Sequence, residues 1–325
     1  AQELLGLVFM LATSLVIARS SNDYSLIKLA LLIGSMKGIC LRRCIHFDAA
    51  LRVVVISLLI ALSLSGVVED AIFYSAAGAV RHSLGFTHPN QLGMACTILC
   101  LEILYLHGMK LKAVPCVIVV AIVASVDYFS ASRTSELIVM LALCLCVANT
   151  WFPKLFKGEA FLKCVQVAPF VCAGATLLSV VLYQQGFQPV IALDEVLSYR
   201  IQYITYHIQL TDIGFFGSDI SANGKTLDSC YAYLLLCQGV VATAAYSVAI
   251  PVLMKRLKGR GDYALMIVFL CLFVYGLSER LWLSVDYDAL MLAFSVLVYG
   301  DGGLNDAAAG CRRADANRWT ARLAS

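Results

Sequence analysis

The chain has 325 residues, of which 61% are hydrophobic and only 14% are charged, and its formal net charge is +3. With a mean hydropathy of +0.83, this composition excludes an ordinary soluble domain and indicates a membrane protein with many spanning segments. So small a net charge does not point to a partner, and we expect no nucleic acid among the ligands.

Ten apolar runs of nearly spanning length follow one another along the chain, since a helix needs about 20 residues to cross a bilayer. They cover residues 1–18, 24–41, 49–68, 89–107, 112–129, 134–151, 161–183, 227–253, 262–278 and 282–300. The second run is the weakest, because Lys28, Gly34 and Lys37 interrupt it. We predict an all-α bundle of about ten transmembrane helices forming one membrane domain, residues 1–300. The start at Ala1, inside an apolar run and without Met, suggests an N-terminally truncated fragment.

The basic residues orient this bundle. With the N-terminus in the cytoplasm, twelve basic residues fall in the inner loops and six in the outer loops, as the positive-inside rule expects. The outer set is Arg19, Arg81, Arg133, Arg200, Lys225 and Arg280. Because Arg presents a planar fork that binds phosphate or carboxylate at two points, an outer set rich in Arg suggests an anionic ligand at the outer leaflet. Ordinary interfacial anchoring is the alternative, above all for Arg19.

Residues 81–93, RHSLGFTHPNQLG, are a polar stretch between two apolar runs. Arg81, His82 and His88 lie near the membrane surface, where charge is costly to place and is therefore often functional. The alternative is an interfacial loop whose Arg reaches towards lipid phosphate.

The longest connection, residues 184–226, lies on the outer side and is too long for a simple turn. Within it Leu193, Leu197, Ile201, Ile204 and Ile208 form one apolar helical stripe. We predict one amphipathic helix, with Asp194 and Glu195 in its first turn and with Arg200, Tyr203 and His207 sharing a neighbouring face. A lid that merely packs on the bundle is the alternative.

Three acidic residues near or within the membrane call for an explanation. Glu102 lies inside an apolar run and should be protonated or paired. Glu136 follows Arg133 by three residues, a spacing that predicts a structural ion pair. Glu279 adjoins Arg280 and could orient a catalytic Arg or simply mark the end of a helix.

Several segments together resemble one family. RHSLGFTHPNQLG resembles the R-x-S-x-G-F-x-H-P-N element of Wzy-type polysaccharide polymerases, which join lipid-linked oligosaccharide repeats, and DYFSASRTSEL is similar to their S-x-S-R-T segment. The large outer loop of that family resembles LSYRIQYIT, GFFGSD and TLDSCYAYLLLCQG here, and Gly276 to Glu279 match its G-L-x-E. The resemblance covers about residues 70–300.

This resemblance implies a GT-C-like, multi-pass glycosyltransferase of the bacterial inner membrane, acting on undecaprenyl-diphosphate-linked oligosaccharides at the outer leaflet. Arg81 and Arg200 are then expected to stabilise the leaving diphosphate, and His207 or His88 to accept the proton of the attacking hydroxyl. The expected substrate-binding residues are Asn90, Arg133, Tyr203, Asp228, Glu279 and Arg280. We expect no cofactor and no metal, since no DxD-like pair stands in an outer loop.

Other functions stay open at this point. An O-antigen-type ligase uses a similar scaffold. A lipid-linked oligosaccharide flippase or other transporter would also have about ten helices, but its charged residues should be scattered along the midplane of the membrane. The further partners expected are membrane lipid, a chain-length regulator and a flippase. Residues 301–325 resemble nothing in the family, and their Gly, Ala and Arg content suggests a disordered or atypical cytoplasmic tail.

Overall fold

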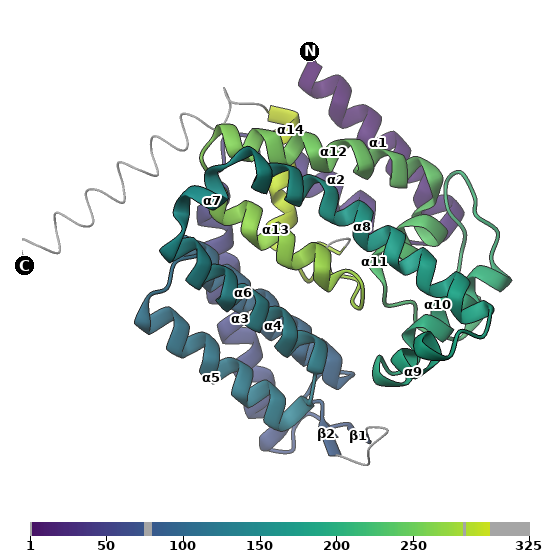
Figure 1. The fold of residues 1–325 in the computed structure, drawn as a ribbon, viewed down its shortest axis with the longest axis horizontal. Helices are drawn as coiled ribbons and strands as arrows, with labels where there is room; N and C mark the ends of the chain where they lie inside the picture. The colour runs from purple at the N-terminus through teal and green to yellow at the C-terminus, as the bar shows by residue number, and fades with distance from the viewer. Residues whose placement is uncertain (1, 75–79, 282–283, 300–325) are drawn as a thin grey trace, which may run out of the picture.

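The computed structural model describes residues 2–74, 80–281 and 284–299, so the expected tail of residues 301–325 lies outside the described part. Of the described residues 75% are helical, and the helices run side by side in one bundle (Figure 1). The strands of the described residues form one antiparallel pair, β1 (Ile72–Tyr74) with β2 (Val80–His82), in which Arg81 lies opposite Phe73. The predicted all-α architecture is confirmed at this level.

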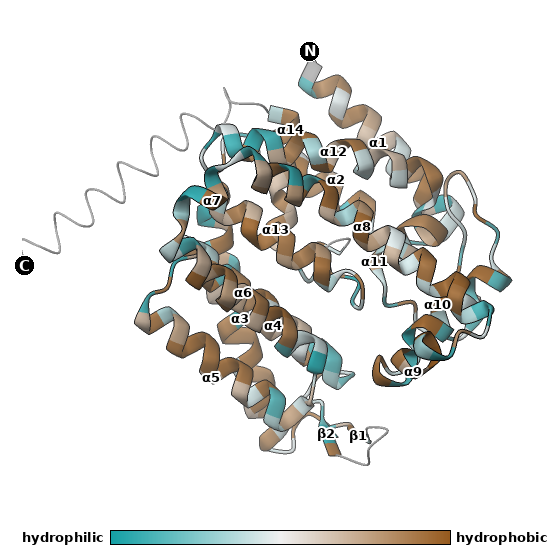
Figure 2. Cartoon of the chain, in the orientation of Figure 1, coloured by the Kyte–Doolittle hydropathy of each residue, from teal (hydrophilic) through white to brown (hydrophobic). Residues whose placement is uncertain are grey.

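Among the described residues, seven helices are long and apolar enough to cross a membrane. They are α1 (Gln2–Ser21), α3 (Leu41–Leu64), α4 (Pro89–Leu106), α5 (Ala113–Ser130), α6 (Arg133–Trp151), α8 (Glu159–Gln184) and the continuous helix made by α11 (Cys230–Tyr233), the π-helical turn η2 (Leu234–Gln238) and α12 (Gly239–Gly259). Hydrophobic residues line them along their length (Figure 2). These helices confirm the prediction of transmembrane helices and support a multi-pass membrane protein.

The three remaining apolar runs form shorter elements. Helix α2 (Ser25–Ser35) has 11 residues and α13 (Tyr263–Tyr275) has 13, which give lengths of about 16 and about 20 Å. The run predicted at 282–300 is not one long helix in its described part, which holds the 3-10 helix η3 (Ala289–Phe294) and the short α14 (Ser295–Tyr299). Its helical structure begins late because Asp288 caps η3 by accepting a hydrogen bond from the Leu290 amide. Ten crossings therefore stay a prediction.

Two helices form the centre of the bundle. In the apolar, membrane-spanning part of α4, 72% of the residues are buried, against 22% in α5. Helix α13 buries Phe269, Phe273 and Tyr275 almost completely. Helices α4 and α6 approach closely at Gly93, where a Cβ atom would lie 2.6 Å from the Ser132 hydroxyl. Side chains on α4 therefore face protein, whereas α1, α3 and α5 expose apolar side chains to the surroundings.

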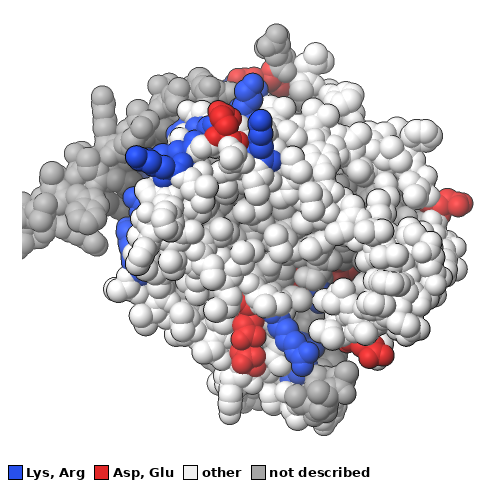
Figure 3. Space-filling model, viewed as in Figure 1, with Lys and Arg blue, Asp and Glu red and all other residues white. Residues whose placement is uncertain are grey.

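The two ends of the bundle differ in charge. At one end, called the basic end, Glu159 pairs with Lys258 and interacts with Lys163 and Lys255, close to the short helix α7 (Pro153–Lys157) with its two lysines. Figure 3 shows Lys and Arg gathered at this corner of the molecule. The opposite end, called the site end, carries β1, β2 and the long connection. This segregation agrees with the predicted excess of basic residues in one set of loops.

The long connection contains two helices where one amphipathic helix was predicted. These are α9 (Gln188–Val196) and α10 (Arg200–Leu210), followed by the 3-10 turn η1 (Ser221–Asn223). The chain reverses between α9 and α10 because Ser198 and Tyr199 adopt left-handed conformations, with φ of 59° and 63°. Asp194 is therefore not in a first helical turn. Its carboxylate instead accepts hydrogen bonds from the Ile201 and Gln202 amides, at 2.7 and 3.2 Å, and so caps α10.

Candidate functional site

Strand β2 positions Arg81 against the ends of two helices. Its Nε donates a hydrogen bond to the Ser130 carbonyl at the end of α5, at 2.7 Å, and a terminal guanidinium nitrogen donates to Asn90 Oδ1 at 2.6 Å. The strand itself is held by Asp70, whose carboxylate accepts from the Leu84 amide at 2.9 Å and lies 2.5 Å from His82 Nδ1. Two contacts thus fix the orientation of the Arg81 fork.

Helix α10 positions Arg200 against the segment that follows α13. One terminal nitrogen donates to the Ser278 carbonyl, and the other lies 2.5 Å from Glu279 Oε1. Both side chains are well buried, with exposed fractions of 12% for Arg200 and 4% for Glu279. The segment is held in turn by Cys230 at the start of α11, whose amide donates to the Gly276 carbonyl at 2.8 Å. Segments that are far apart in the sequence therefore fix the Arg200–Glu279 pair.

The two arginines belong to one electrostatic cluster, called the arginine site. Arg81 interacts with Arg200, Glu279 and Arg133, and Asp228 interacts with Arg200, His88 and Glu279. Burial lowers the pKa of Arg81, and the like charge of Arg200 lowers it further. Burial raises the pKa of Glu279 to about 7 despite the attraction of Arg200. Two cations that interact with each other in a partly buried place form a site suited to a multiply charged anion.

His88 joins this cluster at the start of α4. Its Nδ1 accepts a hydrogen bond from the Asn90 amide at 3.1 Å and so caps the helix, with Pro89 in the first turn. Burial lowers the pKa of His88, and Arg81 lowers it further. The ring is therefore neutral at neutral pH, and because Nδ1 accepts a hydrogen bond, Nε2 carries the proton.

His207 lies apart from the arginine site and is fully buried. Its Nε2 is 3.1 Å from the Lys225 carbonyl and its Nδ1 is 3.0 Å from Asn223 Nδ2, so the ring donates at one nitrogen and accepts at the other. Burial lowers its pKa. On the same helix, Tyr203 is half-buried beneath the ammonium of Lys225, which lies 5.4 Å from the ring centroid. Both residues thus hold the chain that returns from η1.

Arg280 points away from Arg200, although it adjoins Glu279 in the sequence. Its guanidinium stacks on the ring of Tyr233 at 4.2 Å, and the Tyr233 hydroxyl donates to Asp23 at 2.6 Å. The Glu279 carboxylate therefore orients Arg200, and Arg280 helps to join the connection between α1 and α2 to α11.

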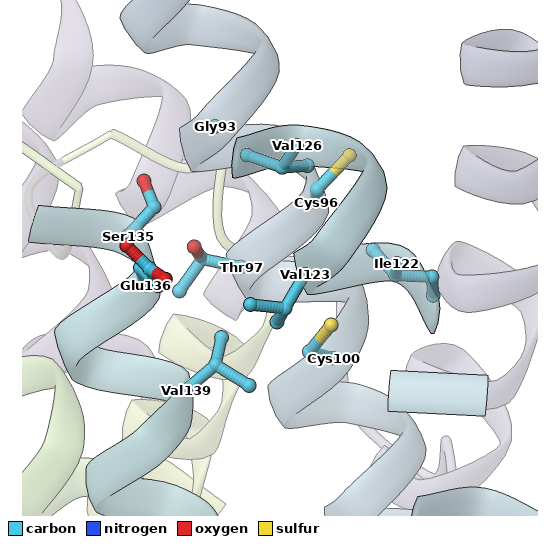
Figure 4. Close-up of a pocket in the computed structure, with 10 residues that line it drawn as sticks. All are labelled: Gly93, Cys96, Thr97, Cys100, Ile122, Val123, Val126, Ser135, Glu136 and Val139. Carbon is cyan, nitrogen blue, oxygen red and sulfur yellow. The ribbon is translucent and has the colours of Figure 1, made fainter. Parts of the chain in front are cut away.

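Arg133 is exposed at the start of α6 and does not form the predicted ion pair with Glu136, as no such contact within 4 Å occurs among the described residues. Glu136 instead lines a crevice between α4, α5 and α6 (Figure 4). The crevice holds about one water molecule, so it is too small for a sugar. Arg133 is left to interact with Arg81.

Sequence reasoning did not identify several groups that build the site. The carbonyl oxygens of Ser130 and Ser278 hold the two arginines, and Thr134 lies 3.5 Å from Glu279. Backbone acceptors carry no sequence signal. Thr134 stood inside the SASRTSEL segment, whose resemblance to the family was the available clue.

Comparisons with known proteins add no relative: no family model matches the chain, and neither curated proteins nor solved structures provide a match.

Proposed function

We propose that the chain is a membrane glycosyltransferase that polymerises undecaprenyl-diphosphate-linked oligosaccharide repeats at the outer leaflet of a bacterial inner membrane. The observation that carries this proposal is the meeting of Arg81 and Arg200 at one end of an apolar helical bundle. The sequence segments that resemble Wzy-type polymerases supply the residues that meet there, including Asn90, Arg133 and Glu279. A chain-length regulator and a flippase are its proposed partners.

The proposed reaction breaks the bond between a sugar and a diphosphate, so negative charge grows on the departing diphosphate. Arg81 and Arg200 are already oriented by protein acceptors, so they need not reorganise as this charge develops. Their forks suit bidentate contacts with phosphate oxygens. Because the guanidinium groups supply the positive charge, we propose that the reaction needs no metal, and a chelator should not change the rate.

The attacking hydroxyl of the acceptor must also lose a proton. Asp228 is half-buried and interacts with both His88 and Arg200, so its carboxylate can receive this proton. His88, with its proton on Nε2, can donate a hydrogen bond to the substrate or pass a proton to Asp228. This assignment replaces His207 with Asp228 in the proton transfer, because both ring nitrogens of His207 are hydrogen-bonded within the protein.

A transporter of lipid-linked saccharides is the second candidate, and one observation favours it. Asp48, Arg52, Glu102 and Asp288 lie together inside the bundle, away from the arginine site, and charges within a membrane often mark an ion pathway. An O-antigen-type ligase differs only in its acceptor, and no contact in the structure favours it over the polymerase.

Deletion of the gene tests these functions against one another. A polymerase predicts that lipid-linked single repeats accumulate at the outer leaflet and that long glycan is lost. Repeats trapped at the inner leaflet would identify a transporter, and free polymer that is never attached to its final acceptor would identify a ligase. Complementation with Arg200→Ala should fail, whereas complementation with Arg19→Ala, an exposed arginine outside the site, should succeed.

A further inference from the structure

Four charged side chains meet inside the bundle at a second place, called the acid cluster. Arg52 Nε on α3 lies 2.6 Å from Asp48 Oδ2 and 3.5 Å from Glu102 Oε2 on α4. Asp288, at the start of η3, interacts with Arg52 and Asp48. Glu102 and Asp288 are both fully buried. Three carboxyl groups therefore share one guanidinium group.

The acid cluster is far from the arginine site. Glu102 is thirteen residues into α4 (Pro89–Leu106), which places it about 20 Å from the site end of that helix and about 6 Å from the other end. Asp48 is seven residues into α3 (Leu41–Leu64), about 10 Å from the basic end. The cluster thus lies in the half of the bundle nearer the basic end.

The charges in this cluster do not balance when all three acids are ionised. Arg52 neutralises one carboxylate, and Asp48 is the nearest. Oε2 of Glu102 makes only the 3.5 Å ion pair with Arg52 Nε, and among the described residues Oε1 of Glu102 and Oδ2 of Asp288 have no hydrogen-bond partner. A buried carboxylate without a partner costs several kcal/mol, so such a group takes up a proton instead. Glu102 and Asp288 therefore each present an oxygen ready for a proton.

The backbone around Asp288 gives independent support. The described residues between α13 and η3 are not helical, yet Leu281 and Asp288 are completely buried. Irregular backbone at membrane depth occurs where it is covered by protein or lines a cavity, and helix ends at that depth commonly hold ions. The start of η3 places Asp288 beside α3 and α4 in this way.

We propose that the acid cluster is a proton-binding site reached from the basic end, with Glu102 and Asp288 as the exchanging carboxyls. Asp48, the most exposed member at 25% of its side chain, provides the route from water. A proton from the aqueous side adds to one carboxylate oxygen and leaves by the same route. A metal is a poor occupant because Arg52 already lies among the carboxyls, and the described residues contain no group of acidic, His or Cys side chains suited to a metal ion.

The proton site stands whichever proposed function holds. Its four members are the charged groups that face one another across α3, α4 and η3. In a polymerase the site would make the bundle sensitive to the proton concentration at the basic end, and in a transporter it would couple transport to protons.

Dicyclohexylcarbodiimide tests the site, because it adds to protonated carboxyls within apolar surroundings. The full chain in proteoliposomes should be labelled at Glu102 or Asp288, as read by mass spectrometry of peptides, and labelling should fall as the pH rises. Glu102→Gln should remove the label from that position. Glu136→Gln, which changes the carboxyl in the crevice of α6, should leave the labelling of the acid cluster unchanged.

Three outcomes would overturn the proposal. The first is labelling that does not depend on pH, and the second is protection by sodium at constant pH, which would assign the site to a metal cation. The third is an unlabelled cluster together with infrared spectra of the wild-type protein in which no protonated-carboxyl band disappears as the pH rises. The infrared measurement decides the matter even where a variant fails to fold.

Discussion

Replacing Asp194 with Ala should loosen the start of α10 and with it Arg200. The carboxylate accepts hydrogen bonds from the Ile201 amide at 2.7 Å and the Gln202 amide at 3.2 Å, and it is 1% exposed. Ile201 is also buried, so its amide would lose its partner without gaining water. The loss of this bond and of the helix cap costs about 1.5–3 kcal/mol. That energy corresponds to about a 10-fold to 150-fold increase in local opening.

Hydrogen exchange followed by mass spectrometry measures this opening directly. Peptides covering residues 200–203 should exchange faster in Asp194→Ala by that factor, and Asp194→Asn, which keeps one acceptor oxygen, should give an intermediate rate. Asp219→Ala is the matched control, because its carboxylate caps the Ser221 amide at 2.9 Å in an exposed turn, so the change should be confined to that turn. Unchanged exchange at residues 201–202 in Asp194→Ala, at normal protein abundance, would refute this account of the outer loop.

Three further predictions concern the same end of the bundle. Gly217→Ala and Gly224→Ala should each introduce a backbone strain of about 1–2 kcal/mol, because both glycines have positive φ. Only at Gly217 would the new Cβ also overlap the Cys237 carbonyl oxygen, so thermal inactivation should be clearly faster for Gly217→Ala. Equal inactivation rates for the two variants would contradict the packing of this loop on η2. His207→Ala should lower thermal stability and slow polymerisation without altering the pH dependence of the rate. A changed pH dependence would instead show that His207 takes part in the proton transfer. Since burial raises the pKa of Glu279 to about 7, protonation of Glu279 below that pH leaves the charge of Arg200 free for the substrate. The affinity for the lipid-linked repeat should therefore rise as the pH falls through about 7, and in Glu279→Gln the affinity should not depend on pH in this range. A pH dependence that persists in that variant would assign the titration to another group.

Hydropathy and charge alone predict most of the scaffold. Runs such as residues 112–129 and 161–183 correspond to α5 and α8. A helix that spans a membrane must be apolar along its whole length, so it is visible in the sequence. The run at 282–300 predicts one spanning helix, whereas its described part holds only short helical elements whose apolar residues are buried against protein: Leu290, Met291 and Ala293 are at most 1% exposed. Composition cannot distinguish a segment surrounded by lipid from one surrounded by other helices.

The candidate site could be predicted only as a list of residues. The resemblance to polymerases supplied Arg81, Arg200 and Glu279, and the structure brings them together. The sequence could not reveal that Arg280 turns towards Tyr233, because adjacent residues after a helix can point in opposite directions. His207 appeared on the face of Arg200 by helical spacing, yet the chain returning past η1 covers it. Long-range contacts of this kind leave no periodic signal.

The most direct test of the central claim is polymer growth by the purified full chain in proteoliposomes supplied with lipid-linked repeats. The account predicts that Arg81→Ala and Arg200→Ala stop growth, that Arg200→Lys impairs it strongly because an ammonium lacks the planar fork, and that Arg19→Ala grows polymer at the wild-type rate. Normal polymer from Arg200→Ala at normal abundance would contradict the assignment of the arginine site to the diphosphate.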